Sequence, residues 1–179
     1  QRLLQLRRQR YALMGTALRV LTIIGARPQI IKAAAISRAI SSMGNGRVVE
    51  TVLHTGQHYD ANMSQVFFDE LGVPRPEVSL GVGGGEPAER TARMIEGIGN
   101  VLSGSEHDLV LLYGDTDSTL AGAVAAAKRR VPIAHVEAGL RSFNKAMPEE
   151  INRVVCDHCS TWLFCPTATA VENLMREGF

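Results

Sequence analysis

The chain has 179 residues, of which 45% are hydrophobic, 21% are charged and 5% are aromatic. This length suits one folded domain, and the apolar fraction excludes an intrinsically disordered chain. No stretch approaches the ~18 uninterrupted apolar residues of a membrane-spanning helix, so the sequence predicts no membrane insertion. The three cysteines are too few for a disulfide scaffold. We therefore expect reduced thiols and a cytoplasmic location.

The formal net charge of +1 hides an uneven distribution of charge. Four arginines lie among the first ten residues, and the rest of the chain carries a net charge of −3. We therefore divide the chain into a basic N-terminal extension, residues 1–17, and a mildly acidic domain, residues 18–179. The domain offers no basic face, so we predict no nucleic-acid partner. Three interpretations of the extension stay open: a terminal segment without a specific role, upstream of a start at Met14, a basic amphipathic arm, or a targeting peptide.

Predicted strands and helices alternate from the start of the domain. Residues 19–24 form an apolar run typical of a buried strand, and Pro28 suits the first turn of the helix that follows. A second strand is predicted over residues 48–54 and a helix over residues 61–71. Residues 72–87 are rich in proline and glycine and predict a loop.

The same alternation continues to the end of the chain. Strands are predicted over 109–113, 131–136 and 161–165. Helices are predicted over 86–103, up to Arg130 with Asp117 or Ser118 as the cap, from Pro148 onward, and over 168–176 with Thr167 as the cap. The helix that begins at Pro148 has an apolar face formed by Ile151, Val154, Val155 and Cys159. Near-continuous apolar strands between helices predict a doubly wound, Rossmann-like α/β domain with a parallel sheet. Ligands bind at the carboxyl ends of the strands in such sheets.

The turn after the first predicted strand is a candidate anion site. Gly25 permits a tight turn, and the following helix N-terminus is expected to present free N–H groups. Arg27 and Lys32 add positive charge, so the turn suits a diphosphate or a carboxylate. A strand–helix turn with surface cations explains these residues equally well.

Two groups of residues contain side chains that can bind metals, but we interpret neither group as a metal site. His54, His58 and Asp60 follow the second predicted strand, but the intervening Gly56 argues against a helical pairing of the histidines. We predict instead a polar loop that lines a pocket and no metal site. Three cysteines, Cys156, Cys159 and Cys165, lack a second ligand pair and are interpreted as core or inert thiols.

Acidic residues follow the third and fourth predicted strands. Asp117 fits a helix cap, whereas Asp115 does not, so we assign Asp115 a functional role. Glu137 stands at the end of a buried strand, where an unpaired charge is costly. The structural alternative for Glu137 is an ion pair with Arg141.

A third acid, Glu149, opens the next predicted helix, where an ion pair with Arg153 would be ordinary. We expect Glu149 to converge with the acids after the third and fourth strands at one sheet edge, facing the cations after the first. Carboxylates grouped in one cleft raise each other's pKa, which suits proton transfer near neutral pH. Cations opposite them would hold an anionic leaving group. The set indicates proton removal next to a departing phosphate ester.

Five segments, in order, carry a family resemblance. They are Gly25-Ala-Arg-Pro-Gln29 with Lys32, Thr55-Gly-Gln-His-Tyr-Asp60, Gly114-Asp-Thr-Asp117, His135-Val-Glu-Ala-Gly-Leu-Arg141 and Pro148-Glu-Glu-Ile-Asn-Arg153. Over residues 19–179 the chain resembles the UDP-N-acetylglucosamine 2-epimerase family, and its non-hydrolysing branch in particular. The resemblance implies the N-terminal half of a glycosyltransferase-B-like fold, with two Rossmann-like domains and the active site between them. It also implies that UDP-GlcNAc and UDP-ManNAc interconvert, for surface polysaccharide synthesis, by elimination of UDP to a 2-acetamidoglucal and re-addition.

The resemblance also implies residue roles. Asp115, Glu137 and Glu149 correspond to the catalytic carboxylates. The substrate-binding residues it implies are Arg27, Lys32, Gln57, His58, Arg141 and again Asp115 and Glu137. No metal or other cofactor is implied, and a homodimer is expected for the full-length form.

The family's second domain, which supplies a catalytic histidine, follows the region that the resemblance covers. We therefore expect the chain to be the N-terminal half of an epimerase, with little activity alone. Two alternatives stay open. One is a hydrolysing 2-epimerase that releases ManNAc and UDP, and the other is a non-catalytic sugar-nucleotide-binding domain.

Overall fold

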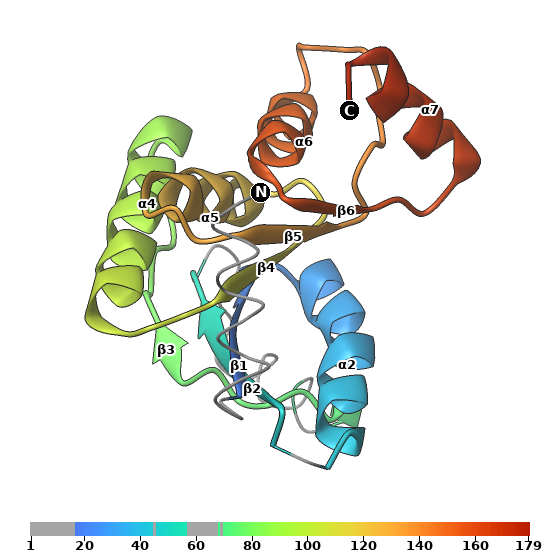
Figure 1. Ribbon diagram of the computed structural model, residues 1–179. Helices are drawn as coiled ribbons and strands as arrows, with labels where there is room; N and C mark the ends of the chain where they lie inside the picture. Colours follow the sequence, from blue (N-terminus) through green and yellow to red (C-terminus); the bar gives the residue numbers. More distant parts are fainter. Residues whose placement is uncertain (1–16, 45, 57–67, 69) are drawn as a thin grey trace.

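A parallel sheet is the frame of the domain in the computed structural model, which describes residues 17–44, 46–56, 68 and 70–179. Within these residues six strands pair in the order β3-β2-β1-β4-β5-β6 (Figure 1). The strands are β1 (Leu18–Ile24), β2 (Val48–His54), β3 (Val78–Ser79), β4 (Leu109–Tyr113), β5 (Ile133–Val136) and β6 (Trp162–Phe164). The chain runs outward from β1 to one edge and then from β4 to the other. The carboxyl ends of β1 and β4 therefore flank the point where such sheets bind ligands.

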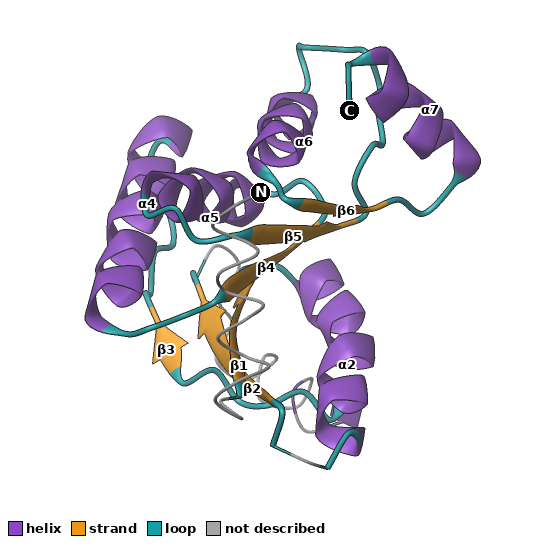
Figure 2. Cartoon of the chain, viewed as in Figure 1, coloured by secondary structure: helices purple, strands orange, loops and turns teal. Residues whose placement is uncertain are grey.

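Helices cover both faces of the sheet, as a doubly wound fold requires (Figure 2). They are α2 (Arg27–Ser42), α4 (Pro87–Gly104), α5 (Asp117–Lys128), α6 (Pro148–Cys159) and α7 (Ala168–Arg176). Leu21 and Ile23 of β1 pack on the face that carries α4 and α5, whereas Val20 and Ile24 pack on the face that carries α2. The predicted Rossmann-like α/β fold is confirmed. None of the helices in the described part of the chain is both long and apolar enough to cross a membrane.

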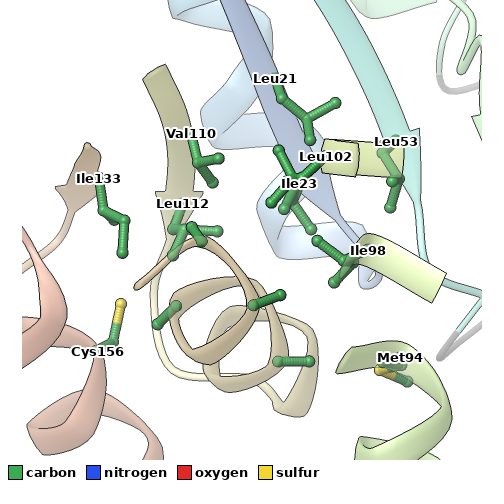
Figure 3. Close-up of a cluster of buried hydrophobic side chains, with 14 of the residues drawn as sticks. Leu21, Ile23, Leu53, Met94, Ile98, Leu102, Val110, Leu112, Ile133 and Cys156 are labelled. Atoms are coloured by element: carbon green, nitrogen blue, oxygen red, sulfur yellow. The ribbon is translucent and has the colours of Figure 1, made fainter. Parts of the chain in front are cut away.

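The larger of the two buried clusters lies between the sheet and helices α4, α5 and α6. Figure 3 shows Leu21, Leu53 and Leu112 from the strands opposite Met94 of α4 and Cys156 of α6. Helix α5 contributes mainly alanines to this cluster, which lets the helix approach the sheet closely. Each fully buried large aliphatic side chain stabilises the fold by roughly 1.5–3 kcal/mol.

The structure corrects the predicted elements at two points. The predicted loop over residues 72–87 contains the short strand β3, in which Val78 pairs with Leu53 of β2. Two residues are too few to show a periodic pattern, so only the pairing reveals the strand. Thr116, rather than Asp117 or Ser118, caps α5, because its side chain accepts the N–H of Thr119. The helix predicted over 61–71 and the extension over 1–17 lie almost wholly outside the described residues.

Helix α6 is also turned differently from the prediction. Ile151 is 43% exposed, and the buried residues of the helix are Glu150, Asn152, Cys156 and Asp157. A polar side chain is buried at modest cost only where it finds hydrogen-bond partners. The three polar ones find them in the loops after β4 and β5. The apolar face predicted for α6 is only partly confirmed, because Cys159 packs against the larger cluster but Ile151 is exposed. Periodicity alone does not reveal the polar partners.

Candidate active site

The turn after β1 is built around the buried side chain of Gln29. Its Oε1 accepts the N–H groups of Gly25 and Ala26, at 2.8 and 3.0 Å. Its Nε2 donates to the carbonyl oxygen of Tyr113 and to the hydroxyl of Thr119, at 2.9 and 3.0 Å. The N–H groups of Gly25 and Ala26 are therefore already bonded within the turn, and the anion site expected at the N-terminus of α2 stays a prediction. The amide of Gln29 instead joins the ends of β1 and β4.

The ends of β1 and β2 and the first turn of α5 approach each other closely at this turn. A Cβ on Gly25 would lie 2.0 Å from Oγ of Ser118 and 2.2 Å from Oγ1 of Thr55. These two hydroxyls are hydrogen-bonded to each other at 2.8 Å. No side chain fits between them, so position 25 requires glycine for steric reasons.

Lys32 and Glu137 form an ion pair between α2 and the loop after β5. The two side chains are 35% and 31% exposed, so the pair is open to solvent on one side. The backbone of Glu137 has a φ of 75°, and its N–H donates to the carbonyl of Phe164. This unusual conformation is rare for a non-glycine residue and holds the side chain at the sheet edge.

Gly114 brings the loop after β4 against this ion pair. A Cβ at Gly114 would lie 3.1 Å from Oε2 of Glu137 and 3.5 Å from Nζ of Lys32. Its φ of 64° also lies in the left-handed region that favours glycine. Asp115 is the next residue in the chain and follows this contact directly at the carboxyl end of β4.

The N-terminal half of α6 holds Asp115 from the other side. The guanidinium of Arg153 pairs with the Asp115 carboxylate and donates to Glu150 at 3.1 Å. The side-chain amide of Asn152 donates to the backbone carbonyl of Asp115 at 2.9 Å. The predicted ion pair between Glu149 and Arg153 is replaced by these contacts.

Asp117 joins the N-termini of three helices. Arg90 of α4 donates to its carboxylate at 2.5 Å, and Asn152 of α6 donates to the other oxygen at 3.3 Å. The carboxylate therefore bridges α4 and α6 from the first turn of α5. This bridge explains why Thr116, and not Asp117, caps the helix.

Glu150 fastens the loop after β5 to α6. Its carboxylate accepts the backbone N–H and hydroxyl of Ser142 and the N–H of Phe143, each at 2.9 Å. Burial opposes ionisation, but these donors and Arg153 hold the pKa of Glu150 below its usual range. A buried carboxylate that stays ionised and fully bonded positions a loop.

The remaining predicted site residues lie in different surroundings. Arg27 is exposed at the first residue of α2, and Glu149 is exposed in the first turn of α6. Gln57 and His58 lie outside the described residues. The side chain of Arg141 is 1% exposed. From the predicted set the structure thus brings Lys32 and Glu137 into contact, and Asp115 follows Gly114, which lies against that pair.

Arg141 forms other ion pairs than the one with Glu137 that we considered as the structural alternative. Its guanidinium donates to Asp157 at 2.7 Å and to both carboxylate oxygens of Glu177, each at 2.7 Å. The planar fork of the guanidinium matches a carboxylate in this two-point arrangement. These bonds give the side chain a structural role beside α6 and α7, and its predicted contact with substrate stays a prediction.

Asp115 and Glu137 each have a cationic partner. The pair of Lys32 with Glu137 agrees with the expected facing of acids and cations, whereas Arg153 as the partner of Asp115 was not expected. Asp115 faces Arg153, and Glu137 faces Lys32. An anionic ligand could compete with the carboxylate for the cation in either pair. In the parts of the chain that the structure describes, no cluster of three or more His, Cys, Asp and Glu side chains is arranged to hold a metal ion. The three cysteines are free thiols.

The comparison with known proteins supports the resemblance of the motifs. The family model described as UDP-N-acetylglucosamine 2-epimerase matches residues 42–179, which is more than half of the chain. The chain belongs to this family.

Two curated relatives illustrate the match. The chain is 54% identical over 162 residues to UDP-2,3-diacetamido-2,3-dideoxy-D-glucuronate 2-epimerase of Pseudomonas aeruginosa, covering 90% of this chain and 45% of that protein. It is 47% identical over 156 residues to UDP-N-acetylglucosamine 2-epimerase of Methanocaldococcus jannaschii, covering 87% and 42%. The chain thus spans less than half the length of these family members.

Solved structures of the family share the fold. A crystal structure of Methanocaldococcus jannaschii UDP-GlcNAc 2-epimerase in complex with UDP-GlcNAc and UDP matches with a TM-score of 0.86 and 46% identity. The match covers 90% of this chain and 44% of that one. A Neisseria meningitidis UDP-GlcNAc 2-epimerase bound to UDP-GlcNAc matches with a TM-score of 0.83 and 31% identity.

Proposed function

We propose that this chain supplies the residues on one side of the active site of a UDP-N-acetylglucosamine 2-epimerase. The observation that carries the proposal is the ion pair of Lys32 and Glu137 at the carboxyl ends of the strands, in a chain of this family. It lies against Gly114, and Asp115 is the next residue in the chain. This is the place where an α/β sheet binds its ligand.

The proposed reaction uses the two carboxylates for proton transfer. The proton on C2 of the sugar passes to a carboxylate, the bond from C1 to the UDP oxygen breaks, and a C1–C2 double bond forms. The proton then returns to C2 on the other face, and UDP adds back at C1, so UDP-GlcNAc becomes UDP-ManNAc. Asp115 and Glu137 are the candidates for this transfer, with Glu149 as a third carboxylate at the rim. Lys32 would stabilise the departing diphosphate.

The test is a chimera in which this chain replaces the matching part of the Methanocaldococcus jannaschii enzyme. We expect the chimera to form UDP-ManNAc from UDP-GlcNAc and, in D₂O, to introduce deuterium at C2, both followed by NMR. Asp115→Asn and Glu137→Gln should each lower kcat by about 100-fold or more, because each removes a proton-transfer group. The exposed Glu89 of α4 provides the control Glu89→Gln, which should keep kcat within about twofold.

Two outcomes would point to the alternatives. Release of free ManNAc with UDP would indicate a hydrolysing epimerase. A folded chimera that binds UDP-GlcNAc without exchange at C2 would indicate a non-catalytic sugar-nucleotide-binding domain.

A second candidate substrate is suggested by the 54% identical relative from Pseudomonas aeruginosa, which is named for UDP-2,3-diacetamido-2,3-dideoxy-D-glucuronate. This nucleotide sugar adds a carboxylate and a second acetamido group to the same UDP-sugar frame. Comparing kcat/KM of the chimera for the two nucleotides decides between them, and a preference of tenfold or more, about 1.4 kcal/mol, would assign the substrate.

The cellular setting follows from the proposed function. We place the product in surface polysaccharide synthesis in the cytoplasm, where UDP-sugars are made, and we expect the working enzyme to be a homodimer. Light scattering coupled to size-exclusion chromatography tests the dimer.

A further inference from the structure

His135, a fully buried histidine on β5, lies next to the candidate active site but takes no part in the proposed chemistry. Its Nδ1 lies 2.7 Å from a carboxylate oxygen of Asp157, and its Nε2 lies 2.7 Å from the carbonyl oxygen of Gly114. A carbonyl oxygen only accepts hydrogen bonds, so Nε2 carries a proton. The ring is fully buried and both of its nitrogens are already in hydrogen bonds within the protein.

The second ring proton depends on Asp157. The other oxygen of this carboxylate accepts the N–H of Gly139 at 3.0 Å and the guanidinium of Arg141 at 2.7 Å. Burial opposes ionisation, but these donors and His135 hold the pKa of Asp157 below its usual range. An ionised carboxylate accepts only, so Nδ1 also donates and the ring is an imidazolium.

The titratable groups that face this ring are both on α6. Burial by itself lowers the pKa of His135, but the hydrogen bond to Asp157 and the neighbouring Cys156 together raise it to about 10. The positive charge of Arg141 lies on the far side of Asp157. The ring therefore keeps both protons at neutral pH.

The carbonyl that Nε2 contacts belongs to the peptide bond between Gly114 and Asp115. The N–H of Gly114 donates to the carbonyl of Val136 at 3.0 Å, so β5 holds this residue at both its N–H and its C=O. Asp115, whose carboxylate pairs with Arg153 of α6, follows directly.

We propose that His135 is a positioning residue, a buried imidazolium that fixes the peptide between Gly114 and Asp115 and so places the Asp115 carboxylate. Asp157 keeps the ring doubly protonated and ties it to α6. The placement of Asp115 is a property of this chain alone, whereas its consequence for turnover rests on the proposed function.

The test is NMR spectroscopy of the 179-residue chain labelled with ¹³C and ¹⁵N, from about pH 6 to about pH 8.5. Both ring nitrogens of His135 should show protonated-type shifts throughout, and the carbonyl ¹³C shift of Gly114 should stay constant. A ring with one protonated nitrogen near neutral pH would overturn the proposal. This measurement needs no variant and no activity.

Substitution of Asp157 tests the link to Gly114. In Asp157→Asn the ring loses its ionised partner, so His135 should titrate at lower pH and the Gly114 carbonyl shift should follow with the same midpoint. The matched control, Glu177→Gln, neutralises the carboxylate on the far side of Arg141 and should leave His135 doubly protonated. A ring titration that the Gly114 carbonyl does not follow would overturn the positioning role.

The chimera then tests the consequence for turnover. Asp157→Asn should lower kcat by about tenfold or more above the midpoint of the His135 titration, with KM changed less, because the carboxylate is misplaced rather than removed. An unchanged kcat across that midpoint would overturn the link to turnover. If the chimera carrying this chain is inactive but the NMR result holds, the proposed function fails and the positioning of Asp115 stands.

Discussion

Single buried polar side chains set the geometry of the candidate site. Gln29, Asn152 and Glu150 each bond to backbone groups of a neighbouring loop, and none of them reaches a reacting atom in the proposed chemistry. Their residue types signal this role only in part. An amide or carboxylate at a position that must be buried indicates a bonded partner, but the partner lies up to 90 residues away in the chain, as for Gln29 and Thr119.

Gln29 offers a prediction at this scale. Gln29→Ala leaves the N–H groups of Gly25 and Ala26 and the carbonyl of Tyr113 without their buried partner. We expect the free energy of unfolding to fall by about 2–4 kcal/mol, as measured by urea denaturation followed by circular dichroism. The control Glu89→Ala truncates an exposed side chain of similar size and should change the free energy of unfolding by no more than about 0.5 kcal/mol. A loss below about 1 kcal/mol for Gln29→Ala would mean that water replaces the amide.

At the scale of elements, α5 and α6 show two different ways of packing on the same sheet. Helix α5 buries alanines, which suit a helix, and Gly122, whose missing Cβ allows close contact with the strands. Helix α6 buries acids and an amide, whose bonds orient the loops after β4 and β5. The first pattern is readable as an apolar face, and the second is not.

Two helical glycines give a matched test of this difference. A Cβ at Gly122 of α5 would lie 2.6 Å from Cδ2 of Leu112 and 3.1 Å from Cδ1 of Ile23, whereas one at Gly99 of α4 would meet nothing within 4 Å. Gly99→Ala should raise the free energy of unfolding by about 0.5–1 kcal/mol through helix propensity. Gly122→Ala should lower it by about 1–2 kcal/mol, because overpacking outweighs the same gain. Thermal and urea unfolding of both variants measure the two signs, and an equal gain in both would contradict the close packing of α5.

For the whole molecule, buried charges balance across the layers of the fold. The imidazolium of His135 and the guanidinium of Arg141 lie with the carboxylates of Asp157 and Glu177, linking β5, the loop after it, α6 and the end of α7. Removing one of these charged side chains by substitution would leave a buried charge unpaired, which costs several kcal/mol. This network makes stability depend on pH.

The direction of that dependence follows from proton linkage. The pKa of His135 is about 10 in the folded chain and about 6.5 in the unfolded chain, so the stabilisation is complete below about pH 6.5 and is lost as the pH rises towards 10. Above about pH 7 the free energy of unfolding should fall by up to about 1.4 kcal/mol per pH unit. Urea denaturation at several pH values between about 6.5 and 9.5 measures this slope.

Two variants separate this histidine from the others. Asp157→Asn should flatten the slope, because it removes the partner that holds the proton on His135. His107→Gln should keep it, because burial and Arg19 already lower the pKa of His107. A slope that persists in Asp157→Asn would assign the pH dependence to another group.

The sequence by itself determined the α/β class, the parallel sheet and the positions after the strands where Lys32, Asp115 and Glu137 stand, because apolar runs and turn residues are local signals. It did not determine the strand β3, the polar face of α6 or the partners of the site residues. Only the tertiary structure paired Glu137 with Lys32, Asp115 with Arg153 and Arg141 with Asp157. The physical reason is that the choice among several possible counter-charges depends on which loops the folded sheet brings within hydrogen-bond distance, and residue spacing along the chain carries no record of that distance.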